Sequence, residues 1–86
     1  MIMTGLTPLS EQARLLKVGA IYEHYKENHY KVTGFGRHSE TLEEHVIYQE
    51  VDGNNRFWVR PLKMFHKKIT LETNQIVTRF RLISAI

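Results

Sequence analysis

The chain of 86 residues contains no cysteine, which excludes disulfides, thiolate metal sites, thiol redox chemistry and cysteine nucleophiles. No apolar run approaches the roughly 18 residues of a membrane-spanning helix. The first residues, MIMTGLTPLSEQ, carry neither the basic region nor the long apolar region of a secretory signal. These absences predict a cytoplasmic protein without membrane contact, and the chain length predicts one domain.

The charge balance is only slightly basic, with a net charge of +3. This excess permits an anionic partner without requiring one. Residues 40–44 (ETLEE) form an acidic loop, whereas the end of the chain is basic. A surface built for phosphates alone would be more uniform, so the charge pattern leaves both nucleic acid and protein partners open.

A short helix is predicted near the N-terminus. Thr7 suits the N-cap and Pro8 the first helical position, with Leu9, Ala13 and Leu16 on one face. We assign residues 1–17 to an N-terminal extension that carries this helix.

From residue 18 the pattern changes to short runs rich in tyrosine, valine, isoleucine and phenylalanine, separated by turn residues. These runs predict strands at 20–25, 29–35, 44–51, 57–60, 67–71 and 75–83. The turn at 52–55 (DGNN) tolerates positive φ, and 61–65 (PLKMF) is interpreted as a connection. Five to six short antiparallel strands cannot cover both faces of a flat sheet, so we predict an all-β, SH3-like barrel or roll over residues 18–86.

Side-chain alternation separates a core face from a charged face in two of these strands. In the last strand the predicted core face carries Ile76, Phe80 and Leu82. In the strand at 57–60 it carries Phe57 and Val59. The opposite faces carry Arg56, Trp58, Arg60, Arg79 and Arg81.

Seven short motifs run along the chain: HYK at 24–26, Tyr30, HSET at 38–41, Tyr48, WVRP at 58–61, MF at 64–65 and RF at 79–80. Their order and spacing resemble a family of small bacterial proteins known only as a domain of unknown function, over residues 17–83. The resemblance implies an SH3-type barrel or roll and no established activity. That family usually has glycine after HYK, where this chain has Glu27. We therefore expect Asn28 to take the left-handed conformation of the turn.

The HSET run is a candidate site. His38 and Glu40 are two residues apart, so on a strand they would share a face and form an acid–base pair. Alternatively, Ser39 and Thr41 cap a turn while His38 and Glu40 pair in solvent. A catalytic triad is disfavoured because adjacent strand residues diverge and the single aspartate, Asp52, lies in a loop.

Metal and cofactor sites are not predicted. The H-x-E of HSET lacks the P-C-x-x-C partner of zinc deaminases. The five histidines show no compact ligand spacing, and those in HYK and FHKK are interpreted as surface residues. Gly34-Phe35-Gly36 has no following helix to bind a phosphate and is interpreted as a bend or bulge.

Aromatic and basic residues interleave along the chain in a way that small barrels use to hold single-stranded nucleic acid, with stacking worth roughly 1–3 kcal/mol per base. Trp58 and Arg60 share a strand face and are the pair best placed to clamp a planar anionic ligand. The simpler alternative is that the tyrosines are core and the arginines serve solubility. The interleaved residues are Tyr22, Tyr25, Tyr30, Tyr48 and Trp58 with Lys26, Arg37, Arg56, Arg60, Arg79 and Arg81.

The sequence thus predicts a non-catalytic binding module for single-stranded nucleic acid or a nucleotide, with its site where HYK, HSET and WVRP meet. The alternatives are a peptide or protein-recognition module, a small enzyme using His38 and Glu40, and a structural domain that self-associates. The sequence does not determine the oligomeric state. The predicted ligand-binding residues are Tyr25, His38, Ser39, Glu40, Trp58 and Arg60.

Overall fold

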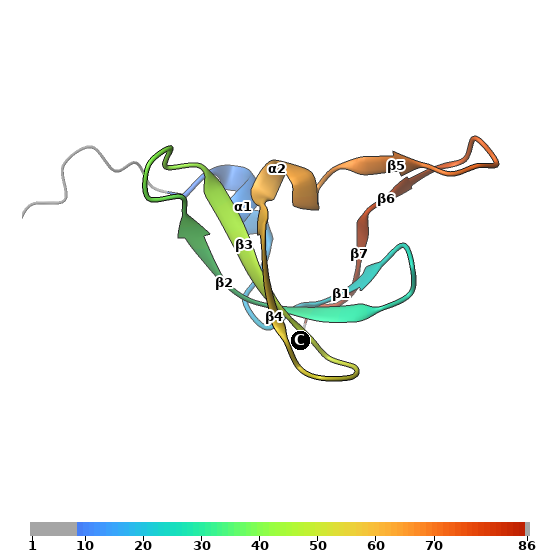
Figure 1. Ribbon diagram of the computed structural model, residues 1–86, viewed down its shortest axis with the longest axis horizontal. Coiled ribbons are helices and arrows are strands. Elements are labelled where there is room, and N and C mark those ends of the chain that lie inside the picture. Colours follow the sequence, from blue (N-terminus) through green and yellow to red (C-terminus); the bar gives the residue numbers. More distant parts are fainter. Residues whose placement is uncertain (1–8, 86) are drawn as a thin grey trace, which may run out of the picture.

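The computed structural model describes residues 9–85. Short strands dominate it (Figure 1). The elements are α1 (Glu11–Leu15), β1 (Ile21–His24), β2 (His29–Arg37), β3 (Glu44–Glu50), β4 (Phe57–Pro61), α2 (Leu62–Phe65), β5 (Lys68–Thr70), β6 (Ile76–Thr78) and β7 (Phe80–Ser84). Neither helix in this part of the chain has the length or the apolar character to cross a bilayer.

The strands form two antiparallel sheets. The larger has the order β4-β3-β2-β1-β7, and the smaller pairs β5 with β6. The β5–β6 hairpin projects away from the larger sheet (Figure 1). This arrangement confirms the predicted mainly β class. Within residues 9–85 no pairing joins β4 to β7, so the sheet is open and the predicted SH3-like barrel is not confirmed.

The strand predicted at 75–83 is divided at Arg79 into β6 and β7, which belong to different sheets. At the break the Arg79 N–H donates to the carbonyl of Lys67 over 3.1 Å, and the Arg79 carbonyl accepts from the N–H of Tyr25 over 2.9 Å. These two bonds replace the ladder bonds of a continuous strand. They hold the chain where it passes from one sheet to the other.

The core assignment of this segment was only partly right. Phe80 is 7% exposed, but Ile76 is 63% and Leu82 49% exposed. Because of the break, Ile76 lies in a hairpin whose outer residues have no covering layer. Leu82 lies on β7, which is an edge strand of the larger sheet.

The core assignment on β4 was wrong. Phe57 and Val59 are each 62% exposed. Trp58 pairs directly with the buried Tyr48 of β3, and cross-strand partners share a face of the sheet. Trp58 and Arg60 therefore lie on the core side of the sheet, and Phe57 and Val59 face outward.

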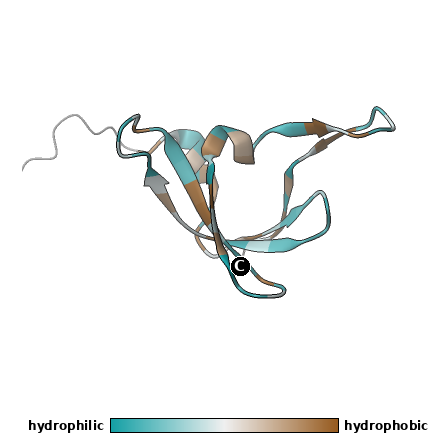
Figure 2. Cartoon of the chain, in the orientation of Figure 1, coloured by the Kyte–Doolittle hydropathy of each residue, from teal (hydrophilic) through white to brown (hydrophobic). Residues whose placement is uncertain are grey.

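Helix α2 replaces the predicted connection at 61–65, because its short turn buries Leu62 and Phe65 together. The Phe65 ring stacks on Phe80, with ring centroids 4.1 Å apart and planes inclined by 5°. The hydrophobic residues lie mostly in α2 and the strands, and the turns that connect these elements are largely hydrophilic (Figure 2). The buried core consists of Ala13, Leu16, Ala20, Tyr22, Val32, Val46, Tyr48, Leu62, Phe65 and Phe80.

Helix α1 begins later than predicted. Its N-cap is Ser10, whose hydroxyl accepts a hydrogen bond from the N–H of Ala13 over 3.2 Å. The predicted cap Thr7 and the predicted first helical residue Pro8 lie outside the described residues. Ala13 and Leu16 are buried, so the predicted apolar face is confirmed and the helix contributes to the same core as the strands.

The turn between β1 and β2 corrects the prediction for Asn28, because Glu27 itself takes the left-handed conformation, with φ 78°. The Glu27 N–H donates to the His24 carbonyl over 2.6 Å, and the His24 N–H donates to the Asn28 carbonyl over 2.8 Å. These bonds form a three-residue hairpin loop, which places its last residue in the left-handed region. The DGNN turn behaves as predicted, with positive φ at Gly53 and Asn55.

Replacing Glu27 with glycine is expected to raise the free energy of unfolding by up to about 1 kcal/mol, because a residue with a Cβ is strained at this φ and glycine is not. Urea denaturation would measure the difference. The control is Glu72→Gly at the tip of the β5–β6 hairpin, where φ is not positive. A Glu27 variant no more stable than the unmodified chain would contradict the strain.

Candidate anion-binding site

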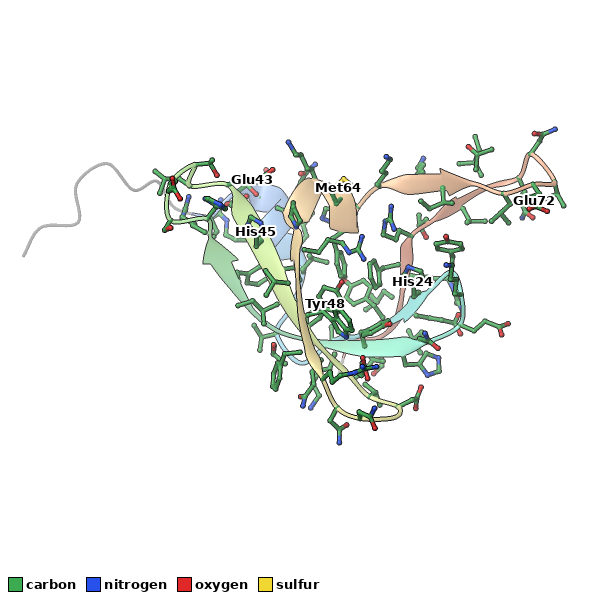
Figure 3. All side chains as sticks on the ribbon, in the orientation of Figure 1. His24, Glu43, His45, Tyr48, Met64 and Glu72 are labelled. Atoms are coloured by element: carbon green, nitrogen blue, oxygen red, sulfur yellow. The ribbon has the colours of Figure 1, made fainter. Side chains whose placement is uncertain are left out.

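A cavity of about 300 Å³ lies between the β1–β2 turn, β4 and the start of β7. We call it the cationic cavity. Tyr25, Trp58 and Arg60, all predicted from the sequence, line it together. The side chains of His24 and Tyr48 point toward this interior (Figure 3). Its full lining is His24, Tyr25, Lys26, Asn28, Tyr30, Tyr48, Trp58, Arg60, Arg79 and Phe80.

The charges of this cavity are all of one sign. Lys26, Arg60 and Arg79 line it, and no carboxylate does. The ion pairs found within residues 9–85 involve other lysines and arginines. Three permanent cations without acidic partners create a positive potential inside a concave surface, which favours an anion.

The fold holds the Arg60 side chain in place and leaves one donor of Arg79 without a partner. The Arg60 Nε donates to the Tyr48 hydroxyl over 3.0 Å, and the guanidinium lies 6.0 Å from the centroid of the Phe80 ring. This leaves the terminal nitrogens of Arg60 available to a ligand. The Arg79 Nε is buried and has no hydrogen-bond partner. Buried donors nearly always have a partner in folded proteins, so this unsatisfied donor is an unusual feature of the cavity lining.

The β1–β2 turn delivers Tyr25 and Lys26 to the cavity. Its backbone is tied to the rest of the fold by the bond from Tyr25 to Arg79. The Lys26 N–H donates to the His24 Nδ1 over 3.2 Å, and the ammonium lies 5.8 Å from the Tyr25 ring centroid. The left-handed Glu27 belongs to the same turn. Backbone strain therefore lies beside the residues of the candidate site, as it often does at functional sites.

Trp58 offers an aromatic face that is fixed but accessible. Its Nε1 donates to the Glu50 Oε2 over 2.7 Å, while 45% of the residue stays exposed. The Arg56 guanidinium lies 5.7 Å from the indole ring. The hydrogen bond from Trp58, followed by the charge of Arg56, lowers the pKa of the Glu50 carboxyl. The carboxylate consequently stays ionised and keeps the indole oriented.

His24 was interpreted as a surface residue, but it lines the cavity and packs edge-on against Phe80 with ring centroids 5.0 Å apart. Burial, and then the charges of Arg79, Arg60 and Lys26, lower the pKa of its imidazole. The HYK motif was the one feature of the sequence that could have pointed to His24 as a site residue. That motif could not reveal that Arg60 and Arg79, both distant in the sequence, lie near the ring.

The pKa of His24 is expected to rise when an anion enters the cavity, because the anion offsets the neighbouring cations. The unfolded chain binds the proton more readily than the folded one, so His24 makes the fold less stable as the pH falls below about 6.5. An NMR titration of the imidazole signals with and without phosphate would measure the shift. His45, on the opposite face of β3, is the control. An unchanged pKa of His24 at saturating phosphate would argue against anion entry.

The HSET run does not line the cationic cavity. His38 Nδ1 accepts hydrogen bonds from the N–H groups of Glu40 over 3.1 Å and Thr41 over 3.3 Å. The Thr41 hydroxyl accepts one from the N–H of Glu43 over 3.2 Å. His38 and Thr41 thus cap the turn, while Ser39 and Glu40 are exposed. The His38 ring faces backbone amides rather than the Glu40 carboxylate.

Within residues 9–85 no group of three or more histidine, aspartate or glutamate side chains is arranged to bind a metal ion.

Comparison with curated proteins finds no match. Among solved structures, the chain is similar to the crystal structure of a DUF1653 protein from Bordetella bronchiseptica, with a TM-score of 0.72 and 24% identity over 86% of this chain and 95% of that chain. At this identity the likeness concerns the fold alone. The model of DUF1653, a protein family of unknown function, matches residues 20–82. The resemblance noted in the motifs is thereby confirmed, and the chain belongs to the DUF1653 family.

Proposed function

We propose that this protein is a non-catalytic binding module whose cationic cavity holds an anionic, planar ligand, either a nucleotide or one unit of single-stranded nucleic acid. The observation that carries the proposal is the set of unpaired cations, Lys26, Arg60 and Arg79, around one cavity. The ligand's anionic group would lie between the two arginines. Arg79 would contribute through the part of its side chain that lines the cavity.

The planar part of the ligand is inferred from the aromatic lining. Trp58 is fixed by Glu50 and remains exposed, and Tyr25 lines the same cavity from the β1–β2 turn. Stacking of a base on such a side chain is worth roughly 1–3 kcal/mol and does not depend on the base. Arginine forks pair with phosphate through two parallel bonds. These two interactions together are typical of small domains that bind nucleotides or single strands.

The proposal includes a roll of SH3-like type as the scaffold and the cytoplasm as the location. The antiparallel sheet of short strands supports the first, because such sheets commonly curl into small barrels. The absence of cysteine in the sequence is compatible with the second. An enzyme using His38 and Glu40 gains no support, since the His38 ring serves the turn.

Titration of the tryptophan fluorescence with nucleotides would test the proposal, because Trp58 is the single tryptophan of the chain. We expect a saturable change with a dissociation constant below about 1 mM, weaker at higher salt. Inorganic phosphate should compete. The proposal fails if nucleotides, short RNA and phosphate all leave the emission unchanged while the protein is folded.

A second candidate function is peptide recognition on the opposite face of the sheet. There a shallow, mainly apolar cavity of about 290 Å³ is lined by Gly36, Ile47 and Val59 among others. The backbone conformation at Gly34 and Gly36 is open to other residues, since neither has a positive φ, and a Cβ added at Gly34 would meet no atom within 4 Å. The register of β2 with β3 shifts between Val32 and Gly34, just before the segment 34–36 in which a bend or bulge was predicted, and residues 34–36 themselves pair regularly. Amide shifts at Gly36, Ile47 and Val59 on adding a proline-rich peptide, without shifts at Tyr25 and Arg79, would favour this function.

A further inference from the structure

The cationic cavity adjoins a second cavity of about 470 Å³, which we call the polar cavity. Asn28, Tyr30 and Trp58 line both of them. The Trp58 indole therefore belongs to the boundary between the two. Ligand pockets commonly enclose about 300–1,000 Å³, so the two cavities together have the dimensions for a small molecule with two chemically different ends.

The polar cavity differs from its neighbour in chemistry, because it contains carboxylates. Glu50 is committed to Trp58 and Arg56. Asp52 is less engaged: its Oδ2 lies 3.4 Å from the His29 Nδ1, and its side chain is 68% exposed. This leaves the second oxygen of Asp52 available as a hydrogen-bond acceptor.

Two amide side chains complete the hydrogen-bonding set. Asn28 and Asn54 line the polar cavity, and within residues 9–85 neither side-chain amide has a hydrogen-bond partner. An amide offers both donors and an acceptor, whereas an ionised carboxylate only accepts. The polar cavity thus offers the donors and acceptors that read the edge of a nucleobase, beside a cavity that attracts its phosphate.

We propose that one nucleotide spans both cavities, with its phosphate in the cationic cavity and its base in the polar cavity, and that Asp52 selects bases with an exocyclic amino group. This inference rests on the proposed function. Cytosine presents an amino group at the position where uracil presents a carbonyl oxygen. The Asp52 carboxylate accepts a hydrogen bond from the former and repels the latter. Whether the nucleotide is free or one unit of an RNA strand, the same contacts apply.

The test compares cytidine and uridine monophosphates, with Trp58 fluorescence as the reporter. We expect cytidine monophosphate to bind at least about 5-fold more tightly, which is the lower end of the discrimination that such contacts provide. Guanosine and inosine monophosphates form a second pair that differs in one amino group. The Asp52→Asn variant should bring both ratios near one while its affinity for ribose 5-phosphate changes less than about 2-fold, because asparagine also carries a donor that suits carbonyl oxygens.

The matched control is Glu72→Gln, which removes one carboxylate at the tip of the β5–β6 hairpin, away from both cavities (Figure 3). It should keep the discrimination. A preference for cytidine over uridine monophosphate supports the inference for free nucleotides. A preference seen only between C-rich and U-rich tetranucleotides supports it for RNA.

Equal affinity for both members of each pair would overturn the inference and leave the proposed function intact. The same holds if Asp52→Asn keeps the preference. If neither nucleotides nor ribose 5-phosphate bind, the proposed function itself fails. Thermal unfolding of each variant, compared with the unmodified protein, shows whether a loss of binding is only a loss of folding.

Discussion

Replacing Arg60 and Arg79 together with glutamine is expected to weaken nucleotide binding by at least about 100-fold. Each substitution removes hydrogen bonds to a charged group, which contribute roughly 1.5–3 kcal/mol each. Glutamine keeps the polarity and much of the length of the side chain, so the shape of the cavity should change little. Titration of Trp58 fluorescence with a mononucleotide measures the loss, and the salt dependence of the residual affinity should become shallower.

The control for this pair is Arg14→Gln with Lys68→Gln, which changes the net charge equally from α1 and β5, outside the cationic cavity. A control that lost as much affinity would show that net charge, rather than the cavity, attracts the ligand. The variant Arg60→Lys distinguishes the effect of the positive charge from that of the two parallel hydrogen bonds that a guanidinium can make. We expect this variant to bind more weakly than the unmodified protein, because lysine keeps the charge but cannot make two parallel bonds or reach Tyr48 through a guanidinium Nε.

The variant Phe65→Ala is expected to lose roughly 3–5 kcal/mol of unfolding free energy, the usual result for a buried phenylalanine. Phe65 is 2% exposed, stacks on Phe80, and meets Tyr22 and Tyr48 edge-on at ring-centroid distances of 5.4 and 5.7 Å. The whole free energy of unfolding of a small domain is roughly 5–15 kcal/mol, so the variant should unfold at a much lower urea concentration.

Phe57→Ala is the matched control for Phe65, because the same atoms are removed from a residue that is 62% exposed on β4. The loss of unfolding free energy in Phe57→Ala should stay below about 1 kcal/mol. Urea denaturation followed by circular dichroism measures both variants. Comparable losses at the two positions would mean that the outer face of β4 is packed in solution, for example against a second copy, and that the core description is incomplete.

The local features of the fold could be predicted from the sequence because neighbouring residues determine them. Alternating β-branched and aromatic residues located the strand-forming segments, although β6 and β7 were predicted as one strand. The DGNN turn has positive φ at Gly53 and Asn55, as expected. The left-handed residue of the β1–β2 turn was assigned wrongly, to Asn28 instead of Glu27. Here the loop length required by the strand pairing overrode the preference of the residue type.

The candidate site could be predicted only in part. Tyr25, Trp58 and Arg60 were chosen because stacking and ion pairing need those residue types, and they do line one cavity. His38, Ser39 and Glu40 were chosen because they are close in sequence, and they lie outside its lining. His24 and Arg79 were missed as site residues. Arg79 reaches the cavity only because the chain changes sheets there.

By itself, the amino-acid sequence determined what depends on composition and on short spacing: a cysteine-free, mainly β chain, its hairpin turns and its stock of aromatic and basic side chains. The tertiary structure decided which face of each strand is buried and which cations meet without acidic partners. Alternation along a strand defines two faces but not which of them turns inward. That choice depends on packing between residues far apart in the chain, such as Phe65 against Phe80 and Trp58 beside Tyr48.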